Sequence, residues 1–199
     1  MARMRDETKR AVILGTAKML FSQKGFFGTS ISDIVRESGL PVGTIYTYFE
    51  SKEAIVRTIV EEGWADLYGR LQAALSQARS PEEAFQALLD RFVPEILGDL
   101  DLINILLAEA IDYTRIEEKL EKLVDLLYPL LKSIPRVEQA LQGLSRRTLT
   151  SALAIYFLGI LNAAKISRSR NIGLKLSDIT GFLKLQLAGL MGVKVGGQP

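Results

Sequence analysis

The stretch at residues 28–55, "GTSISDIVRESGLPVGTIYTYFESKEAI", holds two short helical patterns separated by Gly39 and Pro41. Thr29 or Ser30 can cap the first pattern, and Pro41 suits the first turn of the second. Two short helices joined by a glycine-containing turn are the sequence form of a helix-turn-helix, whose second helix enters the major groove of DNA. Many helical hairpins share this pattern and bind nothing, so the pattern alone leaves the function open.

Helical periodicity continues on both sides of this stretch, and no alternating strand pattern of useful length is present. We therefore predict an all-α fold of about nine helices, with a three-helix head at 1–50 and a larger helical domain at 51–199. The first helix should run from Asp6 to Gln23, and Gly25 supplies its C-terminal stop. Later helix starts are predicted at Ser51, in capping boxes at 80–83 and 114–117, and at Pro135, Ser145 and Ser177.

The composition excludes several classes of site. The chain has 199 residues, of which 48% are hydrophobic, and contains neither cysteine nor histidine. Disulfides, thiol nucleophiles, imidazole bases and most zinc, haem or copper sites are thereby excluded. We expect no cofactor, no metal and no enzymatic activity.

The longest uncharged run lies at 148–164, "TLTSALAIYFLGILNAA". Its 17 residues are at the short end for a membrane span. We interpret it as a helix buried on nearly all sides, at the centre of a bundle or at a subunit interface. The start "MARMRDETKR" has no apolar signal region, which favours a cytoplasmic protein without a membrane partner.

The charge is unevenly distributed, although the net charge is only +2. Residues 1–52 hold eight Lys or Arg against five acids, residues 53–138 nine against seventeen, and residues 139–199 eight against one. Solvated helix faces explain most such runs. A basic head followed by an acidic middle also suits a protein that presents one end to a polyanion.

Residues 11–55 resemble the N-terminal domain of the TetR family of transcriptional regulators. The resemblance rests on "LFSQKGF", the "TS" before the second helix, the Gly39 turn, "GTIYTYF", and the "SKE" that opens the long helix. Val35 and Ser38 depart from the family pattern, which more often has alanine there. The remaining three quarters of the chain resemble the family only in layout.

The resemblance implies roles for the residues of the head. Ile45 and Phe49 should pack the recognition helix into the head. Three residues should contact DNA phosphates: Thr29, Tyr48 and Lys52. Base edges should face Val42, the backbone of Gly43, Thr44, Tyr46 and Thr47, with Arg36 as a nearby candidate for guanine. The alternative is that the two tyrosines only fill the core or the surface.

The recognition helix "PVGTIYTY" contains no Arg, Lys, Asn or Gln, and so lacks the side chains that read guanine and adenine through two hydrogen bonds. We predict that Val42, Thr44 and Thr47 read thymine methyl groups and that DNA shape adds to the specificity. Arg3 and Arg5 lie along the minor groove or form a solvated arm.

A single head binds little DNA, so the natural arrangement is a homodimer on a palindromic operator of double-stranded DNA. The resemblance implies an interface of four helices, two from each subunit, at about 145–167 and 177–193. Small residues there allow close approach of the helices: Ala154, Gly159, Ala163, Gly181 and Ala188. The alternative is that both helices form the core of a monomer.

A regulator of this kind switches when a small-molecule effector binds one arrangement of the heads more tightly. The long helix from Lys52 is the link, with Gly63 as a weak point. The pocket should lie between Trp64 and Tyr128, with an apolar lining that suggests a lipophilic or aromatic effector. Its candidate residues are Trp64, Tyr68, Phe85, Phe92, Asn104, Glu109, Asp112, Tyr113, Tyr128 and Tyr156. For each of these the alternative is an ordinary core or surface position.

The sequence therefore predicts a repressor released by its ligand. An activator or a regulator without a ligand would carry the same head. A helical lipid-binding or membrane-peripheral protein that uses the run at 148–164 is the alternative from another class.

Overall fold

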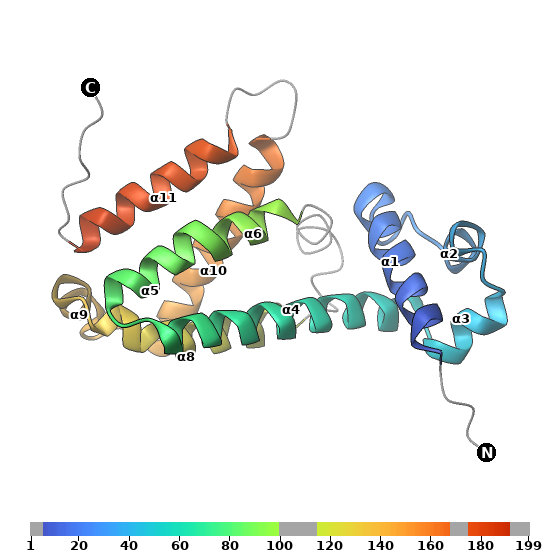
Figure 1. The fold of residues 1–199 in the computed structure, drawn as a ribbon, viewed down its shortest axis with the longest axis horizontal. Helices are drawn as coiled ribbons and strands as arrows, with labels where there is room; N and C mark the ends of the chain where they lie inside the picture. Colours follow the sequence, from blue (N-terminus) through green and yellow to red (C-terminus); the bar gives the residue numbers. More distant parts are fainter. Residues whose placement is uncertain (1–5, 100–114, 168–174, 192–199) are drawn as a thin grey trace, which may run out of the picture. The chain divides into compact units, whose positions relative to one another are not determined.

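The computed structural model describes residues 6–99, 115–167 and 175–191, and within these ranges the chain is helical (Figure 1). In chain order the elements are α1 (Glu7–Lys24), α2 (Ile31–Ser38), α3 (Val42–Tyr48), α4 (Lys52–Gln77), α5 (Pro81–Ala87), the π-helical η1 (Leu88–Phe92), α6 (Val93–Gly98), α8 (Ile116–Lys132), α9 (Pro135–Leu141), α10 (Arg146–Ser167) and α11 (Leu176–Met191). Because α5, η1 and α6 follow one another without a break, the described residues form nine helices. The predicted all-α fold is confirmed.

The chain divides into two compact units, and the division falls inside α4. The first unit comprises Met1–Asp66 and Asp99–Ile116, and the second comprises Leu67–Gly98 and Glu117–Pro199. The first unit extends beyond the predicted head at 1–50 because the early turns of α4 bury apolar side chains, among them Ile55, Val56 and Val60.

The first unit is built on α1, α2 and α3, with α1 packed on α2 and α2 on α3. Each start has a local cause. The Asp6 carboxylate accepts a hydrogen bond from the Thr8 amide at the start of α1, and Ser30 and Asp33 form a reciprocal capping box at the start of α2. The Ser51 hydroxyl accepts a hydrogen bond from the Ala54 amide at the start of α4.

Two glycines are required by the backbone of the head. Gly39 ends α2 at φ 68°, in the left-handed region that glycine adopts without strain. At Gly28 a Cβ atom would lie 2.2 Å from the Lys24 carbonyl oxygen, so only glycine fits this loop without a shift of the backbone.

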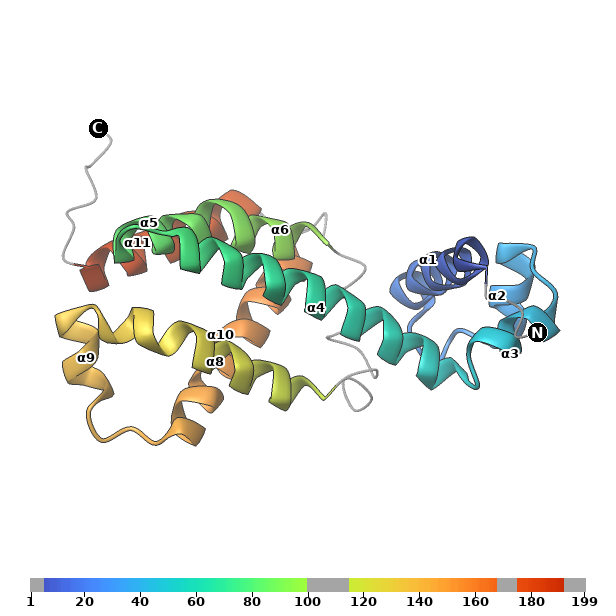
Figure 2. The same ribbon diagram turned by 60° about the horizontal axis from the view of Figure 1, so that its bottom comes forward.

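In the second unit α11 packs against α10, α9, η1 and α6. It lies alongside the α5–α6 helix (Figures 1 and 2). Phe85 on α5 forms a buried cluster with Ile134 and Val137. Pro129 lies inside α8, which continues past it to Lys132, so this proline does not end the helix.

Two predictions for the second unit are wrong. The last helix begins at Leu176, one residue before the predicted start at Ser177, because the Asp178 carboxylate accepts a hydrogen bond from the Lys175 amide and caps the helix there. The helix α10 is not buried on nearly all sides within one chain. Its buried residues are Thr150, Leu161 and Ala164. The predicted capping box at 114–117 begins at Thr114, outside the described residues.

Candidate nucleic-acid interface

The helix α3 has one buried face and one exposed face. Ile45 is fully buried and Phe49, directly after the helix, is 6% exposed. On the other face Val42 is 52% exposed and Tyr46 is 55% exposed. The buried pair anchors α3 in the head, so that two large side chains are held in solvent at fixed positions.

Gly43 and Thr47 lie one turn apart on α3, and both are exposed. The Thr47 hydroxyl donates a hydrogen bond of 2.8 Å to the Gly43 carbonyl, so its hydrogen is already used. A Cβ atom at Gly43 would meet no other atom of the protein within 4 Å. The fold itself therefore does not require glycine here. Thr44 is half-buried.

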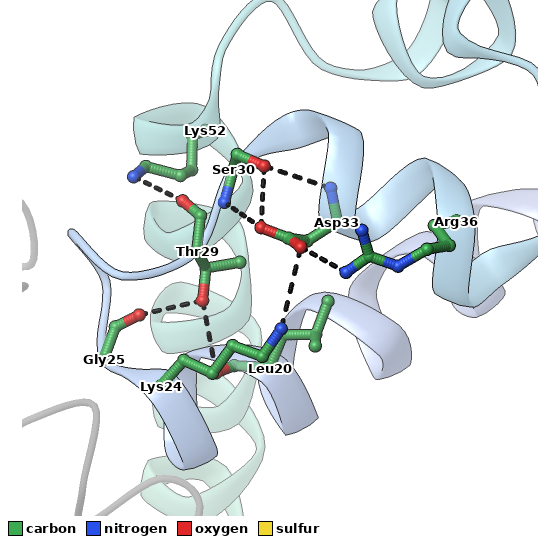
Figure 3. A network of polar contacts seen from close by, with 8 residues as sticks. All are labelled: Leu20, Lys24, Gly25, Thr29, Ser30, Asp33, Arg36 and Lys52. Carbon is green, nitrogen blue, oxygen red and sulfur yellow. Dashed lines mark hydrogen bonds and ion pairs between the residues drawn. The ribbon is translucent and has the colours of Figure 1, made fainter.

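Thr29 and Lys52 hold the loop before α2 in place (Figure 3). Thr29 is 1% exposed, and its hydroxyl shares its one hydrogen between the carbonyls of Gly25 (2.8 Å) and Leu20 (3.2 Å). Because the hydroxyl is buried and bonded inside the protein, the structure does not support the predicted phosphate contact of the Thr29 side chain. This residue holds the end of α1 against the loop.

The Lys52 ammonium donates hydrogen bonds of 2.7 Å to the carbonyls of Phe26 and Thr29 and lies 4.3 Å from the centre of the Phe26 ring. It thus joins the start of α4 to the loop before α2. An ammonium has three donors, so two internal bonds leave one for a phosphate. The predicted phosphate contact of Lys52 is compatible with this arrangement.

Tyr48 is half-buried at the end of α3, and its hydroxyl forms two hydrogen bonds with the backbone of Asp6. It accepts from the Asp6 amide at 2.8 Å and donates to the Asp6 carbonyl at 3.0 Å. The sequence suggested a phosphate contact for this hydroxyl. In the structure the same atom ties the end of α3 to the start of α1.

Asp33 is the centre of a polar network on α2 (Figure 3). Its carboxylate accepts hydrogen bonds from the Ser30 hydroxyl (2.7 Å), the Ser30 amide (3.0 Å) and the Arg36 guanidinium, and lies 3.6 Å from the Lys24 ammonium. The Ser30 bonds, followed by the Arg36 bond, hold the pKa of Asp33 well below its usual range. Arg36, the predicted guanine reader, is thus paired with Asp33, but its side chain is 67% exposed.

The sequence did not predict the contacts that join distant segments within the head. Asp6 was placed as a helix start, yet it is also the partner of Tyr48, which lies 42 positions away. Arg10 on α1 pairs with Glu62 on α4 and lies 5.9 Å from the centre of the Phe49 ring. No local pattern marks either contact.

The exposed apolar side chains of the second unit gather on α10 and α11. Ile155 is 73% exposed, Tyr156 57% and Phe182 55%. A groove of about 360 Å³ lies between the two helices. It is lined by Ile155, Tyr156, Gly159, Ile160, Ala163, Asp178, Ile179, Phe182 and Leu183. Within the described ranges, α10 is also the one helix with the length and apolar composition of a membrane span.

Two of the residues predicted to form the dimer interface lie at this groove. Gly159 and Ala163 line it, and Gly181 is exposed on the neighbouring helix α11. Ala154 and Ala188 are half-buried. Tyr156, one of the candidate effector residues, also lines this groove.

The six predicted effector residues that the structure describes do not line one common pocket. Phe85 and Phe92 are 5% and 2% exposed, so both are packed core positions. Trp64 and Tyr68 are half-buried on α4, and Tyr128 lines a small cleft beside Pro129 and Leu149. Four further candidates lie outside the described residues: Asn104, Glu109, Asp112 and Tyr113.

A larger apolar cleft of about 460 Å³ lies in the second unit, at the ends of α4 and α8 and the start of α5. Leu75, Pro81, Ala84, Leu126 and Leu130 supply apolar lining, and Arg79 contributes a cation. None of the predicted effector residues lines it. Its residues were missed because they come from two stretches that lie far apart in sequence, 72–84 and 126–133.

The head is similar in sequence to known proteins, and the fold is similar to solved structures. The family model described as "Bacterial regulatory proteins, tetR family" matches residues 13–59. The HTH-type transcriptional regulator YuxN of Bacillus subtilis is 31% identical over 115 residues, which cover 57% of this chain and 40% of YuxN. The HTH-type transcriptional repressor KstR2 of Mycolicibacterium smegmatis is 32% identical over 81 residues, 41% of this chain and 40% of KstR2. The chain thus spans less than half the length of these curated relatives.

A solved structure with a similar fold is the transcriptional regulator FadR of Bacillus subtilis, in complex with stearoyl-CoA. The TM-score is 0.68 at 17% identity, and the match covers 92% of this chain and 97% of FadR. At this identity the likeness concerns the fold alone, and it extends beyond the head.

Proposed function

Because the chain belongs to the TetR family of transcriptional regulators, we propose that it is a homodimeric, sequence-specific DNA-binding repressor that leaves its operator when a lipophilic or aromatic ligand binds. Its work on DNA would place it in the cytoplasm. Members of the family regulate transcription and are not enzymes, so no catalytic role is assigned.

One observation carries the DNA-binding part of the proposal. A helix anchored by the buried Ile45 holds Val42 and Tyr46 in solvent, each more than half exposed. Exposed apolar side chains at fixed positions on a short helix suit the thymine methyl groups of the major groove. Glycine at position 43, which the fold does not require, lets the backbone of α3 approach the bases.

Thr47 offers a test of how the helix reads its operator. Its hydroxyl hydrogen is held by Gly43, so we expect its methyl group to make the contact with DNA. In a duplex selected from a random library, replacement of the contacted thymine by uracil removes only the methyl group. This should weaken binding about fourfold, the value of one buried methyl group.

Two matched variants decide between the methyl group and the hydroxyl. Thr47→Val keeps the methyl group and should remain sensitive to uracil, whereas Thr47→Ser keeps the hydroxyl and should lose this sensitivity. Binding is measured by fluorescence anisotropy. If every contacted thymine tolerates uracil without loss of affinity, methyl reading is wrong.

The dimer proposal rests on α10 and α11. An apolar groove with exposed Ile155, Tyr156 and Phe182 is costly to leave in water, and a second copy of the same face would cover it. Exposed small residues beside these side chains, such as Gly159, allow helices to approach closely.

The effector proposal rests on the apolar cleft at the ends of α4 and α8 and the start of α5. FadR of B. subtilis, a protein of the same fold, was crystallised with stearoyl-CoA, a lipophilic ligand. Stearoyl-CoA is therefore the first probe, with free coenzyme A as the control. We expect stearoyl-CoA, and not coenzyme A, to release the protein from the selected duplex. A lack of release would exclude this ligand and leave DNA binding intact.

The apolar helix α10 also keeps the second candidate function, a membrane-peripheral protein, open to test. Liposome flotation in the presence and absence of the selected duplex separates the two functions. The repressor proposal predicts no flotation with the liposomes. Association that DNA does not compete away would favour the membrane-peripheral protein.

A further inference from the structure

The apolar cleft at the ends of α4 and α8 and the start of α5 has a single charged residue among the described residues that line it. This residue is Arg79, in the turn between α4 and α5. Arg79 is exposed, and no ion pair joins its guanidinium to a carboxylate in the described part of the chain. A guanidinium carries five N–H donors in a planar fork that matches a carboxylate. The cleft therefore offers a binding group for an anion.

The turn that carries Arg79 is held by hydrogen bonds that leave the guanidinium unused. The Arg79 amide donates to the Glu83 carboxylate at 2.7 Å, and the Ser80 hydroxyl accepts from the Glu83 amide at 3.2 Å. Both bonds belong to the start of α5, where Ser80 is the N-cap. The backbone of Arg79 is thus fixed beside the cleft, and its guanidinium remains available to a ligand.

The helices around this turn give the cleft an apolar lining. Its volume of about 460 Å³ is in the range of pockets that hold small molecules. Two serines also line it, but the hydroxyls of Ser76 and Ser133 donate to backbone carbonyls three residues earlier, at 2.9 and 2.6 Å. Apolar side chains come from α4, α5 and α8: Leu75, Ala84, Leu126 and Leu130. The cleft thus combines an apolar wall with one cation.

We propose that this cleft binds a single-chain lipid with a free carboxylate. The alkyl chain lies on the apolar lining, and the carboxylate binds the Arg79 guanidinium. This inference names the chemical class of the effector and rests on the effector role of the cleft in the proposed function. A free carboxylate suits a single guanidinium, because two parallel hydrogen bonds satisfy both groups. Coenzyme A would instead bring several phosphate charges to a cleft with one cation.

Four probes with the same alkyl chain and different head groups test the proposal: decanoate, decanol, decylamine and decanoyl-CoA. Their binding to the full chain is measured by isothermal titration calorimetry at neutral pH. Decanoate should bind about tenfold more tightly than decanol, as expected for a charge-assisted hydrogen bond. Decylamine should bind more weakly than decanol, because its cation would lie beside Arg79. Decanoyl-CoA should bind more weakly than decanoate.

Three variants locate the site. Arg79→Gln should lower the affinity for decanoate to that for decanol and leave decanol binding unchanged, whereas a damaged fold would weaken both. Arg136→Gln is the matched control, since Arg136 is an exposed arginine of α9 that does not line the cleft. Ser76→Trp places a large side chain in the cleft from an exposed position of α4 and should weaken both ligands. Thermal unfolding followed by circular dichroism checks that each variant is folded.

Four results would overturn the proposal. They are equal affinities for decanoate and decanol, a preference for decanoate that survives Arg79→Gln, unchanged binding in Ser76→Trp, and binding of decanoyl-CoA alone. The last of these would contradict the free carboxylate and still support the cleft as an effector site.

The proposed function is tested separately, by adding decanoate to the protein bound to a selected duplex. Release of the duplex is expected, and it should require Arg79. If decanoate binds through Arg79 and the duplex stays bound, the carboxylate site stands and the proposed release by a ligand in this cleft is wrong.

Discussion

At the scale of a single residue, Gly43 is a helical glycine that the fold itself does not require. Inside a helix glycine costs about 1 kcal/mol relative to alanine, and nothing in the protein occupies the space that a Cβ atom would fill. A residue that lowers stability without a structural reason needs a reason outside the chain. In the proposed function, close approach of α3 to DNA supplies that reason.

Gly43→Ala should therefore raise the free energy of unfolding by about 1 kcal/mol and weaken DNA binding. The control is Gly15→Ala, since Gly15 is an exposed glycine in α1 that also has open space around it. This control should raise stability in the same way and leave binding unchanged. Thermal unfolding and fluorescence anisotropy measure the two effects. Unchanged DNA affinity of Gly43→Ala would contradict the close approach of α3.

The lowered pKa of Asp33 predicts that the stability of the folded chain depends on pH. Its folded pKa lies below the unfolded value of about 3.9, chiefly because Ser30 donates two hydrogen bonds to it. The unfolded chain therefore binds more protons in this range. The contribution of Asp33 to stability is complete above the unfolded pKa and is lost as the pH falls toward the folded pKa.

Asp33→Asn should lower the unfolding temperature at pH 7, and the gap to the wild type should shrink as the pH falls below about 4. Glu37→Gln is the control, because Glu37 is an exposed acid on the same helix without a hydrogen bond or ion pair in the described part of the chain. It should show little gap at either pH. A gap for Asp33→Asn that does not change with pH would show that the charge of Asp33 is not what stabilises α2.

At the scale of elements, α10 and α11 carry an unusual amount of exposed apolar surface. Ile155 is 73% exposed in a helix whose buried residues number three among those described. A helix this apolar is normally covered. The dimer proposal explains the exposure, because the second subunit would bury the groove between the two helices.

Ile155→Glu should convert the dimer to a monomer, because the interface would have to bury an unpaired carboxylate. The matched control is Lys165→Gln, which changes the net charge by the same amount at an exposed position of α10. Sedimentation equilibrium gives the mass of each variant. A wild-type monomer, or an Ile155→Glu variant that remains dimeric, would place the interface elsewhere or remove it.

Local signals predicted most of the helix boundaries. Gly25, Gly39, Ser30 and Pro135 each mark a helix end or start that the structure confirms, because caps and turns depend on neighbouring residues. The start of α11 was missed because Asp178 reaches back to the Lys175 amide. The π-helical turn at Leu88–Phe92 has no local signature in the sequence.

Contacts between distant segments were the least predictable. The bonds between Tyr48 and Asp6 join positions 42 residues apart, and the internal bonds of Lys52 join positions 23 and 26 apart. The same limit applies to the effector residues. Phe85 has the spacing of a helical aromatic, and only packing against Ile134 and Val137 identifies it as core.

At the scale of the whole molecule, the proposed function assigns a different task to each of the two compact units. The first unit carries α3 and its exposed face, and the second carries the apolar cleft and the groove of α10 and α11. One helix, α4, contributes residues to both units. In the proposed function a ligand acts on DNA binding through this helix, and it does so only to the extent that its affinity differs between two states of the protein.

The most direct test of this account is native mass spectrometry of the protein with a duplex selected from a random library. The account predicts two chains on one duplex, whose enriched sequence has two-fold symmetry with half-sites about one helical turn, roughly 34 Å, apart. One chain for each duplex, or a library from which no sequence is enriched, would contradict the proposed homodimeric repressor.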